Sequence, residues 1–208
     1  MLVAFCPCSP SCPIFSLFTH IILVLERQIM DRLEEELLAG FDEDGETFEF
    51  AGPWLKRPAD LDKLIKSQNT RVREVVASIG RDKDLDVLVN DPERDVRLQV
   101  AEWGRDKDAD VLVNDSDPCI REEIARQGRP EHLDILINDP DYSVRSMVAF
   151  LGRDKHLDKL VSDPDWRVRE SVAIRGREQD LLRLENDENQ AVREEVARQR
   201  RMQNDLPK

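Results

Sequence analysis

Three cysteines near the start of the chain are the residues best suited to bind a metal. Cys6, Cys8 and Cys12 form a C-x-C-x₃-C pattern, and the fourth cysteine, Cys119, stands alone far downstream. Structural zinc sites and four-iron clusters normally take four protein ligands within a folded surround. This pattern lacks a fourth ligand, so we predict no metal site, no cofactor and no disulfide framework. A redox or metal-binding (iron–sulfur) protein using these thiols is kept as the alternative function.

Two histidines, His132 and His156, could also bind a metal or transfer protons. They share one position of an internal repeat with Asp84, Asp108 and Asp180. Stacked helices lie about 10 Å apart, so adjacent copies cannot easily share an ion whose bonds are about 2 Å long. We predict that this column is solvent-exposed. Because no nucleophile elbow, P-loop or dinucleotide-binding glycine pattern is present either, we assign no catalytic residue and predict no enzyme.

The internal repeat is 24 residues long and aligns without a gap. Its position 1 falls at Ser67, Asp91, Asp115, Asp139, Asp163 and Asp187. Positions 6 and 10 are apolar and four residues apart, which is helical spacing, as Val96 and Val100 illustrate. An aspartate N-cap at position 1 and a glycine at position 14 should bound this helix. Position 11 is alanine in all six copies, at Ala77, Ala101, Ala125, Ala149, Ala173 and Ala197, which predicts close packing between repeats.

The second part of each repeat is shorter and has leucines three residues apart, such as Leu85 and Leu88. In a 3₁₀-helix, residues i and i+3 eclipse, so this spacing favours a short 3₁₀-helix. Two-helix repeats usually need about 33 to 47 residues, so a second long helix does not fit. A β-strand leucine-rich repeat is the structural rival, because its period also includes 24.

The recurring pattern DPxxxVRxxVAxxGRDxxLDxLVN resembles the leucine-rich repeat variant family, whose form is HEAT-like. The resemblance covers about 150 residues. It implies an all-α, right-handed superhelical solenoid of alternating α- and short 3₁₀-helices, without β-strands. Members of that family can carry an N-terminal cysteine cluster that holds an iron–sulfur centre, but Cys6, Cys8 and Cys12 match it poorly.

The remaining segments are assigned from composition. Residues 1–25 carry no charged side chain, but prolines interrupt the apolar stretch and no basic residue precedes it. We therefore expect synthesis to begin at Met30, with 1–29 an upstream extension that has no fold, rather than a targeting or membrane segment. Residues 30–54 are interpreted as an acidic and aromatic cap, and 55–208 as the array of one half and six repeats. The cap residues are Leu33, Leu37, Leu38, Phe41, Phe48, Phe50 and Trp54.

Charged and aromatic columns suggest how the array is held together and what it binds. Arginines recur at position 7 (Arg73 to Arg193) and position 15 (Arg81 to Arg201), and we predict ion pairs between repeats for both. The net charge of −13 opposes binding to nucleic acid. Position 4 places Tyr142 and Trp166 on consecutive repeats, and exposed aromatics are favoured in interfaces. We therefore predict a non-enzymatic, cytoplasmic protein-interaction scaffold with Tyr142 and Trp166 at the partner site, the alternative being packing between repeats.

Overall fold

The computed structural model describes residues 13–39 and 57–204, and in these ranges its regular secondary structure is helical with no strand. The chain divides into two compact units, Met1–Asp84 and Leu85–Lys208. The first contains α1 (Pro13–Leu38), α3 (Pro58–Leu64), α4 (Thr70–Ile79) and the start of α5 (Asp82–Leu88). The prediction of an all-α solenoid is confirmed.

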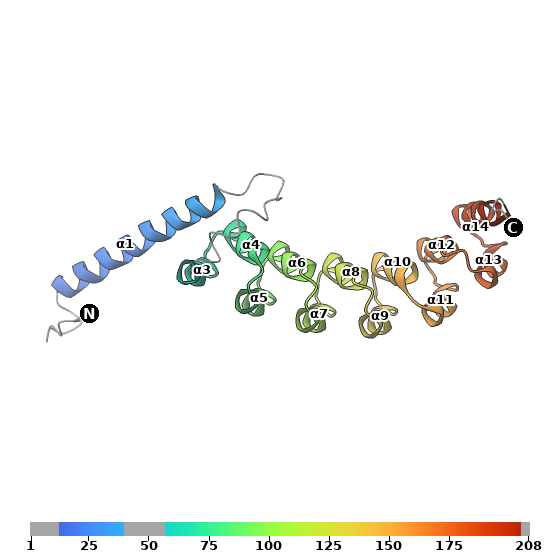
Figure 1. Cartoon of the computed structure of the whole chain (residues 1–208), viewed down its shortest axis with the longest axis horizontal. Coiled ribbons are helices and arrows are strands. Elements are labelled where there is room, and N and C mark those ends of the chain that lie inside the picture. Colours follow the sequence, from blue (N-terminus) through green and yellow to red (C-terminus); the bar gives the residue numbers. More distant parts are fainter. Residues whose placement is uncertain (1–12, 40–56, 205–208) are drawn as a thin grey trace. The chain divides into compact units, whose positions relative to one another are not determined.

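The second unit alternates longer and shorter helices. The longer ones form one row and the shorter ones a second row (Figure 1). The longer helices are α6 (Arg94–Glu102), α8 (Pro118–Arg126), α10 (Tyr142–Leu151), α12 (Trp166–Ile174) and α14 (Gln190–Asn204). The shorter ones, after the end of α5, are α7 (Asp106–Leu112), α9 (Pro130–Leu136), α11 (Asp154–Leu160) and α13 (Glu178–Leu184).

The core of this unit is built from the apolar repeat positions. Val144 and Val148 of α10 are fully buried, and so is Ala149, which follows them. The same holds for the equivalent residues of α6, α8 and α12. Consecutive long helices pack on each other here, and the small alanine side chain allows their backbones to approach closely. The predicted inward face is therefore confirmed.

The N-caps of the long helices lie two residues later than predicted. The carboxylate of Asp139, at position 1, accepts the backbone N–H of Asp141 in a tight turn. The cap is Asp141, at position 3, whose carboxylate accepts the backbone N–H of Ser143. Position 3 caps α4, α8 and α12 in the same way. The prediction of a cap at position 1 is wrong because that carboxylate is already engaged by the turn and by an arginine.

Glycine ends four of the long helices as predicted. Gly80, Gly104, Gly128 and Gly176 have φ between 64° and 75°, the left-handed region that favours glycine. Gly152 is different, with φ −66°. Space, not φ, requires glycine there: a Cβ would lie 2.4 Å from the carbonyl oxygen of Val148 and 2.8 Å from Nδ1 of His156.

The short helices are α-helices of seven residues, not the predicted 3₁₀-helices. Their ends carry i→i+3 bonds, as from the N–H of Asp139 to the carbonyl of Leu136. The bond from Leu133 N–H to Arg129 carbonyl is instead i→i+4. Leucines three apart also share a face of an α-helix, so the spacing did not discriminate between the two helix types.

Helix α1 caps the first unit. Leu33 and Leu37 are buried, and α1 packs on α3 and α4. Glu36 forms an ion pair with Arg57 at 2.6 Å. The sequence predicts no fold for residues 1–29, but residues 13–29 form the first part of α1. The boundaries of the extension (1–29), the cap (30–54) and the array (55–208) stay predictions. The predicted cap residues Phe41, Phe48, Phe50 and Trp54 lie outside the described residues. None of the described helices has the length and apolar character needed to cross a membrane.

Candidate functional site

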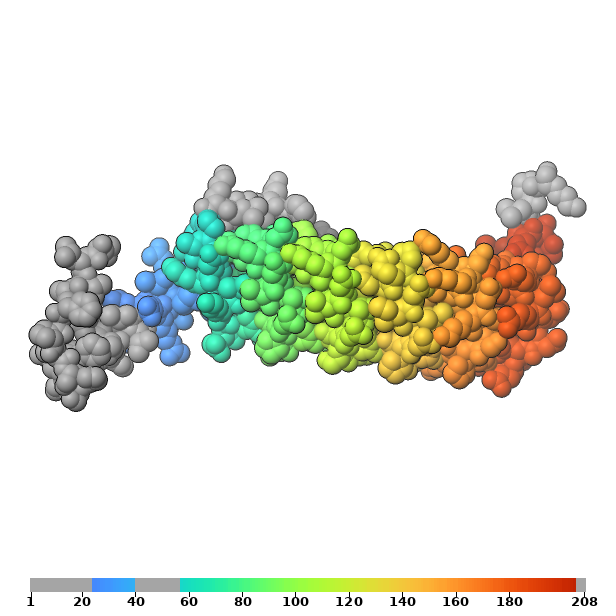
Figure 2. Space-filling model, turned by 90° about the horizontal axis from the view of Figure 1, so that it is seen from below, coloured from blue at the N-terminus to red at the C-terminus, as the bar shows by residue number. Residues whose placement is uncertain are grey.

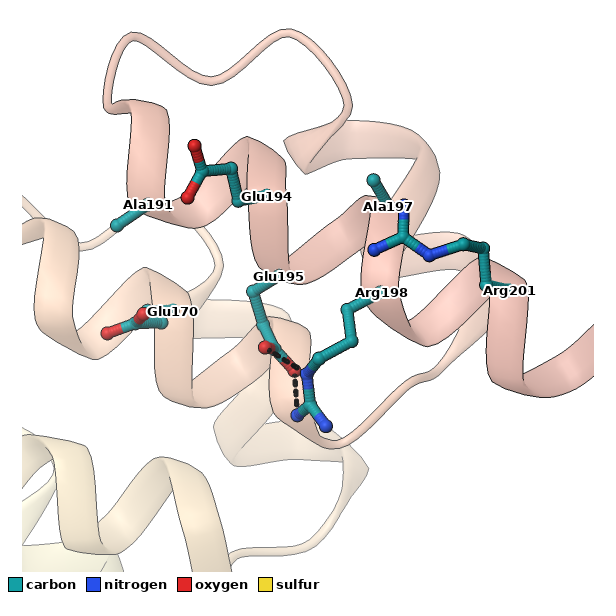
Figure 3. A pocket seen from close by; sticks show the side chains of 7 residues that line it. All are labelled: Glu170, Ala191, Glu194, Glu195, Ala197, Arg198 and Arg201. Atoms are coloured by element: carbon teal, nitrogen blue, oxygen red, sulfur yellow. Dashed lines mark hydrogen bonds and ion pairs between the residues drawn. The ribbon is translucent and has the colours of Figure 1, made fainter.

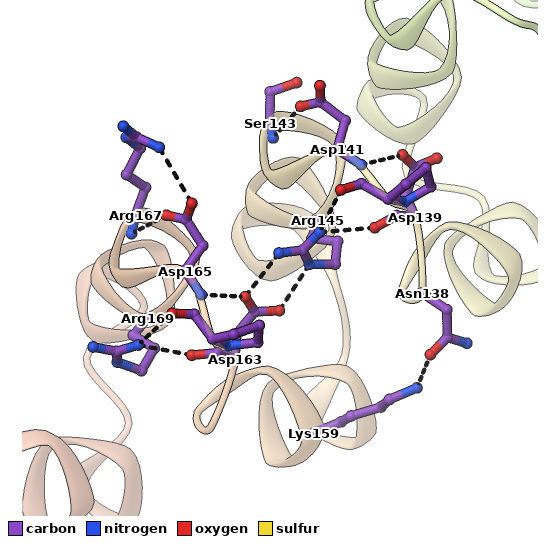
Figure 4. Close-up of polar contacts among 12 residues, drawn as sticks. Asn138, Asp139, Asp141, Ser143, Arg145, Lys159, Asp163, Asp165, Arg167 and Arg169 are labelled. Atoms are coloured by element: carbon purple, nitrogen blue, oxygen red, sulfur yellow. Dashed lines mark hydrogen bonds and ion pairs between the residues drawn. The ribbon is translucent and has the colours of Figure 1, made fainter.

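The position 7 arginines join consecutive repeats. Arg145 of α10 donates through Nε and Nη2 to both carboxylate oxygens of Asp163 in the next repeat, at 2.8 and 2.9 Å (Figure 4). Its Nη1 donates to the carbonyls of Asp139 and Pro140. The equivalent pairs are Arg97 with Asp115, Arg121 with Asp139, and Arg169 with Asp187. The predicted ion pairs between repeats are confirmed for this column.

These pairs set the ionisation of their members. The bond to Asp115 raises the pKa of Arg97, although its burial acts in the opposite direction. Burial alone would raise the pKa of Asp115, but the hydrogen bonds from Arg97 and from the backbone N–H of Asp117 outweigh it, so the pKa of Asp115 is lowered. Both groups are therefore held in their charged forms, which strengthens the bidentate contact.

The position 15 arginines form a second set of links, on the short helices. Arg105 donates to Asp108 of its own repeat at 2.5 Å and pairs with Asp86 of the preceding repeat at 3.0 Å. Arg177 does the same with Asp180 and Asp158. Burial opposes the charge of Arg177, yet its carboxylate contacts raise its pKa. The position 18 carboxylate therefore orients the arginine that reaches back to the previous repeat.

His132 and His156 occupy position 18 in two repeats, and they are buried, with exposed fractions of 2% and 1%. The prediction of a solvated column is wrong. Nε2 of His132 lies 2.9 Å from Asp110, and Nε2 of His156 lies 2.8 Å from Asp134. Each histidine thus contacts the position 20 aspartate of the preceding repeat. In repeats with aspartate at position 18, the position 15 arginine makes that contact instead. One sequence signal could have indicated this: position 18 immediately precedes a leucine of the repeat pattern and lies one turn after the arginine.

The tautomer of His156 follows from its partners. Its Nδ1 accepts the backbone N–H of Arg153 at 2.9 Å, so Nε2 carries the hydrogen that is donated to Asp134. No group of three or more potential metal-ligating side chains occurs in the part of the chain that the structure describes. Cys6, Cys8 and Cys12 lie outside that part, and Cys119 is exposed and free.

Tyr142 and Trp166, the predicted partner-binding residues, begin α10 and α12. Tyr142 is 40% exposed and Trp166 is half-buried. The guanidinium carbon of Arg167 lies 4.2 Å from the centre of the Tyr142 ring and 5.2 Å from that of Trp166. Arg167 is also paired with Asp165 at 3.2 Å. The Arg167 guanidinium thus connects the two aromatic rings. The sequence analysis did not predict this contact.

A shallow hollow on the long-helix side of α12 and α14 is lined mainly by charged side chains. Glu195 and Arg198 form an ion pair across it at 2.6 Å, and Glu170, Glu194 and Arg201 surround them (Figure 3). Burial would raise the pKa of Glu195, but its bonds from Arg198 and Gln199 lower it. A carboxylate held ionised by an adjacent arginine is a poor proton donor, so this hollow does not indicate acid catalysis.

Comparisons with known proteins agree with the architecture. No protein-family model and no curated protein matches the chain. A solved structure described as a leucine-rich repeat variant with a novel repetitive structural motif is similar, with a TM-score of 0.61 and 22% identity over 83% of this chain and 82% of that one. A designed armadillo repeat protein in complex with the peptide (KR)4 covers 84% of this chain and 91% of its own, at 12% identity and a TM-score of 0.30. The likeness to the leucine-rich repeat variant structure shows that the chain has that fold, as its repeats predict.

Proposed function

We propose that this protein is a non-enzymatic, cytoplasmic protein-interaction scaffold and that its partner contacts Tyr142 and Trp166. The observation that carries the proposal is the Arg167 guanidinium stacked on both rings, on consecutive repeats. A cation over an aromatic face is worth about 0.5 to 1 kcal/mol at an exposed site. That energy holds the rings in place before a partner arrives, which lowers the entropic cost of binding.

The exposure of Tyr142 supports this proposal further. Tyr142 keeps 40% of its surface in solvent although it lies at the start of a well-packed long helix. Aromatic and arginine side chains are the types most enriched among residues that dominate binding energy. The three side chains of this cluster, Tyr142, Trp166 and Arg167, combine both types within one contact area.

The test replaces both rings and compares binding with stability. Proteins captured from the native host by the wild-type chain are identified by quantitative mass spectrometry, and the captured partner is then purified and titrated calorimetrically. The Tyr142→Ser, Trp166→Ser double variant should weaken that partner by about 2 kcal/mol and leave the melting temperature nearly unchanged. Phe150→Ser is the matched control, because Phe150 is also exposed, at 50%, and lies on α10.

The alternative is that the rings only pack between repeats. In that case the double variant would melt several degrees lower while the affinity for the partner stays the same, and the proposed site would not exist. An equal loss of affinity in Phe150→Ser would also count against it, since the effect would then belong to the whole surface.

A further inference from the structure

The short helices carry a row of exposed aliphatic side chains at repeat position 21. Val87, Val111 and Ile135 are 59%, 47% and 50% exposed. Each lies one residue before a buried leucine, so the helix that carries it is fixed in the core. Exposed β-branched side chains in the same position of three consecutive repeats form a row, whereas scattered single apolar residues on a surface need no explanation. Figure 2 shows the short-helix side of the second unit, in green to red.

Hollows follow this row from repeat to repeat. One is lined by Val111 together with Asn90 and Asn114, and the next by Ile135 together with Asn114 and Asn138. A third is lined by Asn138 and Lys159. Asn114 and Asn138 each border two hollows, so neighbouring hollows share a lining residue, and we call this line of three hollows, with the position 21 side chains along it, the groove. None of its lining residues is Tyr142, Trp166 or Arg167.

The charge of the groove changes along its length. After the three aliphatic residues, position 21 becomes Lys159 and then Arg183. Lys159 contacts the side-chain oxygen of Asn138, and Arg183 donates to the hydroxyl of Ser162 at 3.1 Å. Among the described residues neither forms an ion pair, whereas the neighbouring Lys155 pairs with Asp134. In a chain with a net charge of −13, two consecutive cations without a carboxylate partner are available for an external one.

The spacing of the row selects the conformation of a peptide that could follow it. Packed helices lie about 8 to 10 Å apart. A polyproline II helix has three residues per turn and rises about 3.1 Å per residue, so every third side chain recurs on one face after about 9.3 Å. A β-strand places every second side chain on one face, roughly 6.7 Å apart. Of these two extended conformations, the polyproline II repeat is the one that matches one residue per rung of the groove.

We propose that this groove binds a peptide in the polyproline II conformation with a small aliphatic residue at every third position, followed by acidic residues at the same interval. The aliphatic side chains contact Val87, Val111 and Ile135, and the carboxylates pair with Lys159 and Arg183. A polyproline II backbone has no internal hydrogen bonds. The amides of Asn90 and Asn114, which can both donate and accept, are placed to pair with one peptide unit per turn.

The probe is a fluorescent synthetic peptide of three Val-Pro-Pro turns followed by two Glu-Pro-Pro turns, tested in both chain directions by fluorescence anisotropy with the full-length protein. One direction should bind. The Val111→Ser, Ile135→Ser double variant should bind it about tenfold more weakly or worse, the level reached when 1.4 kcal/mol is lost, with an unchanged melting temperature. Leu182→Ser is the matched control, because Leu182 is 58% exposed on α13 but lies at position 20, and it should bind normally.

Charge reversal supplies a gain of function that a misfolded variant cannot give. Lys159→Glu with Arg183→Glu should reject the peptide with glutamates and bind the matched peptide with lysines in their place. The proposal is overturned if neither chain direction binds, if a peptide of equal composition with valine at every second position binds as well, or if the serine double variant keeps full affinity. The Tyr142→Ser, Trp166→Ser variant should retain the peptide, so failure of the scaffold site and failure of this groove are distinguishable.

Discussion

Replacing Arg145 with methionine tests whether the position 7 ion pairs hold the repeats together. The change keeps most of the side-chain volume but removes the two bonds to Asp163 and the two to the carbonyls of Asp139 and Pro140. The side chain of Asp163 is only 5% exposed, and its remaining hydrogen bond is from the backbone N–H of Asp165. Breaking one side of a buried pair costs about 3 to 5 kcal/mol, and access of solvent at the rim places this case near 3 kcal/mol.

Arg193 provides the matched control within the same column. Its Nη1 donates to the carbonyls of Asp187 and Glu188, as Arg145 does to its own repeat, but no ion pair is recorded for it in the residues that the structure describes. Arg193→Met should therefore lose only neutral-acceptor bonds, about 1 kcal/mol. The difference between the two variants, about 2 kcal/mol, isolates the carboxylate contact to the next repeat.

The measurement is urea unfolding followed by circular dichroism, combined with native-state hydrogen exchange. Repeat arrays are stabilised mainly by nearest-neighbour interfaces, so Arg145→Met should increase amide exchange on both sides of the interface between α10 and α12 more than in α6. Equal losses of unfolding free energy in Arg145→Met and Arg193→Met would refute the reasoning. So would exchange that rises uniformly along the second unit, since the lost contact would then not be local.

Three further changes test the packing, the acid response and the N-terminal segment. Ala149→Leu should cost about 1 to 3 kcal/mol or more through overpacking, measured by urea unfolding, and a neutral result would mean that the packed face is misplaced. Because the pKa of Asp115 is lowered in the folded chain, its pair with Arg97 should stabilise fully above the unfolded value of about 3.9 and be lost as the pH falls through the folded value. Arg97→Met should flatten the unfolding free energy in that range, and an unchanged acid profile would contradict this. Deleting residues 1–29, which retains the buried Leu33 and Leu37, should change stability by no more than about 0.5 kcal/mol, and a large loss would show that the segment is structural.

Much of the fold could be predicted because it is repeated. A valine at position 6 or an alanine at position 11 means little in one copy, but six copies in register give the burial of Val144 and Ala149 directly. The ion pairs of position 7 could be predicted for the same reason, since each repeat supplies both an arginine and an aspartate. The repetition did not show which aspartate caps the helix and which one accepts the arginine. Asp139 looks like a helix cap but turns the chain and accepts Arg121, while Asp141 is the cap.

The position 18 histidines failed prediction for a physical reason. Aspartate and histidine at the same repeat position predict a polar, solvent-exposed column, because both residue types are more often exposed than fully buried. The aspartates are buried because an arginine of the same helix covers them, as Arg105 covers Asp108. The histidines are buried without a covering arginine. Their Nε2 atoms contact a carboxylate of the previous repeat directly, Asp110 for His132 and Asp134 for His156. Both arrangements link neighbouring repeats. His156 has partners for both ring nitrogens, whereas no hydrogen bond from the described residues reaches Nδ1 of His132, and only three-dimensional contacts distinguish these cases.

The division of the repeat positions between assembly and surface supports the two binding surfaces that we propose, at positions 4 and 21. Positions 6, 10 and 11 fill the core, and positions 1, 7, 15 and 18 carry turns and links between repeats, so a substitution there disturbs neighbouring copies. Position 4 lies at the start of each long helix and position 21 on the open side of each short helix, where only some copies make links, as Arg94 does with Asp117 and Arg183 with Ser162. Both positions vary in chemistry, from Pro118 to Trp166 at one and from Val87 to Arg183 at the other. A repeat array can thus keep one set of contacts for assembly while its binding surfaces change from rung to rung.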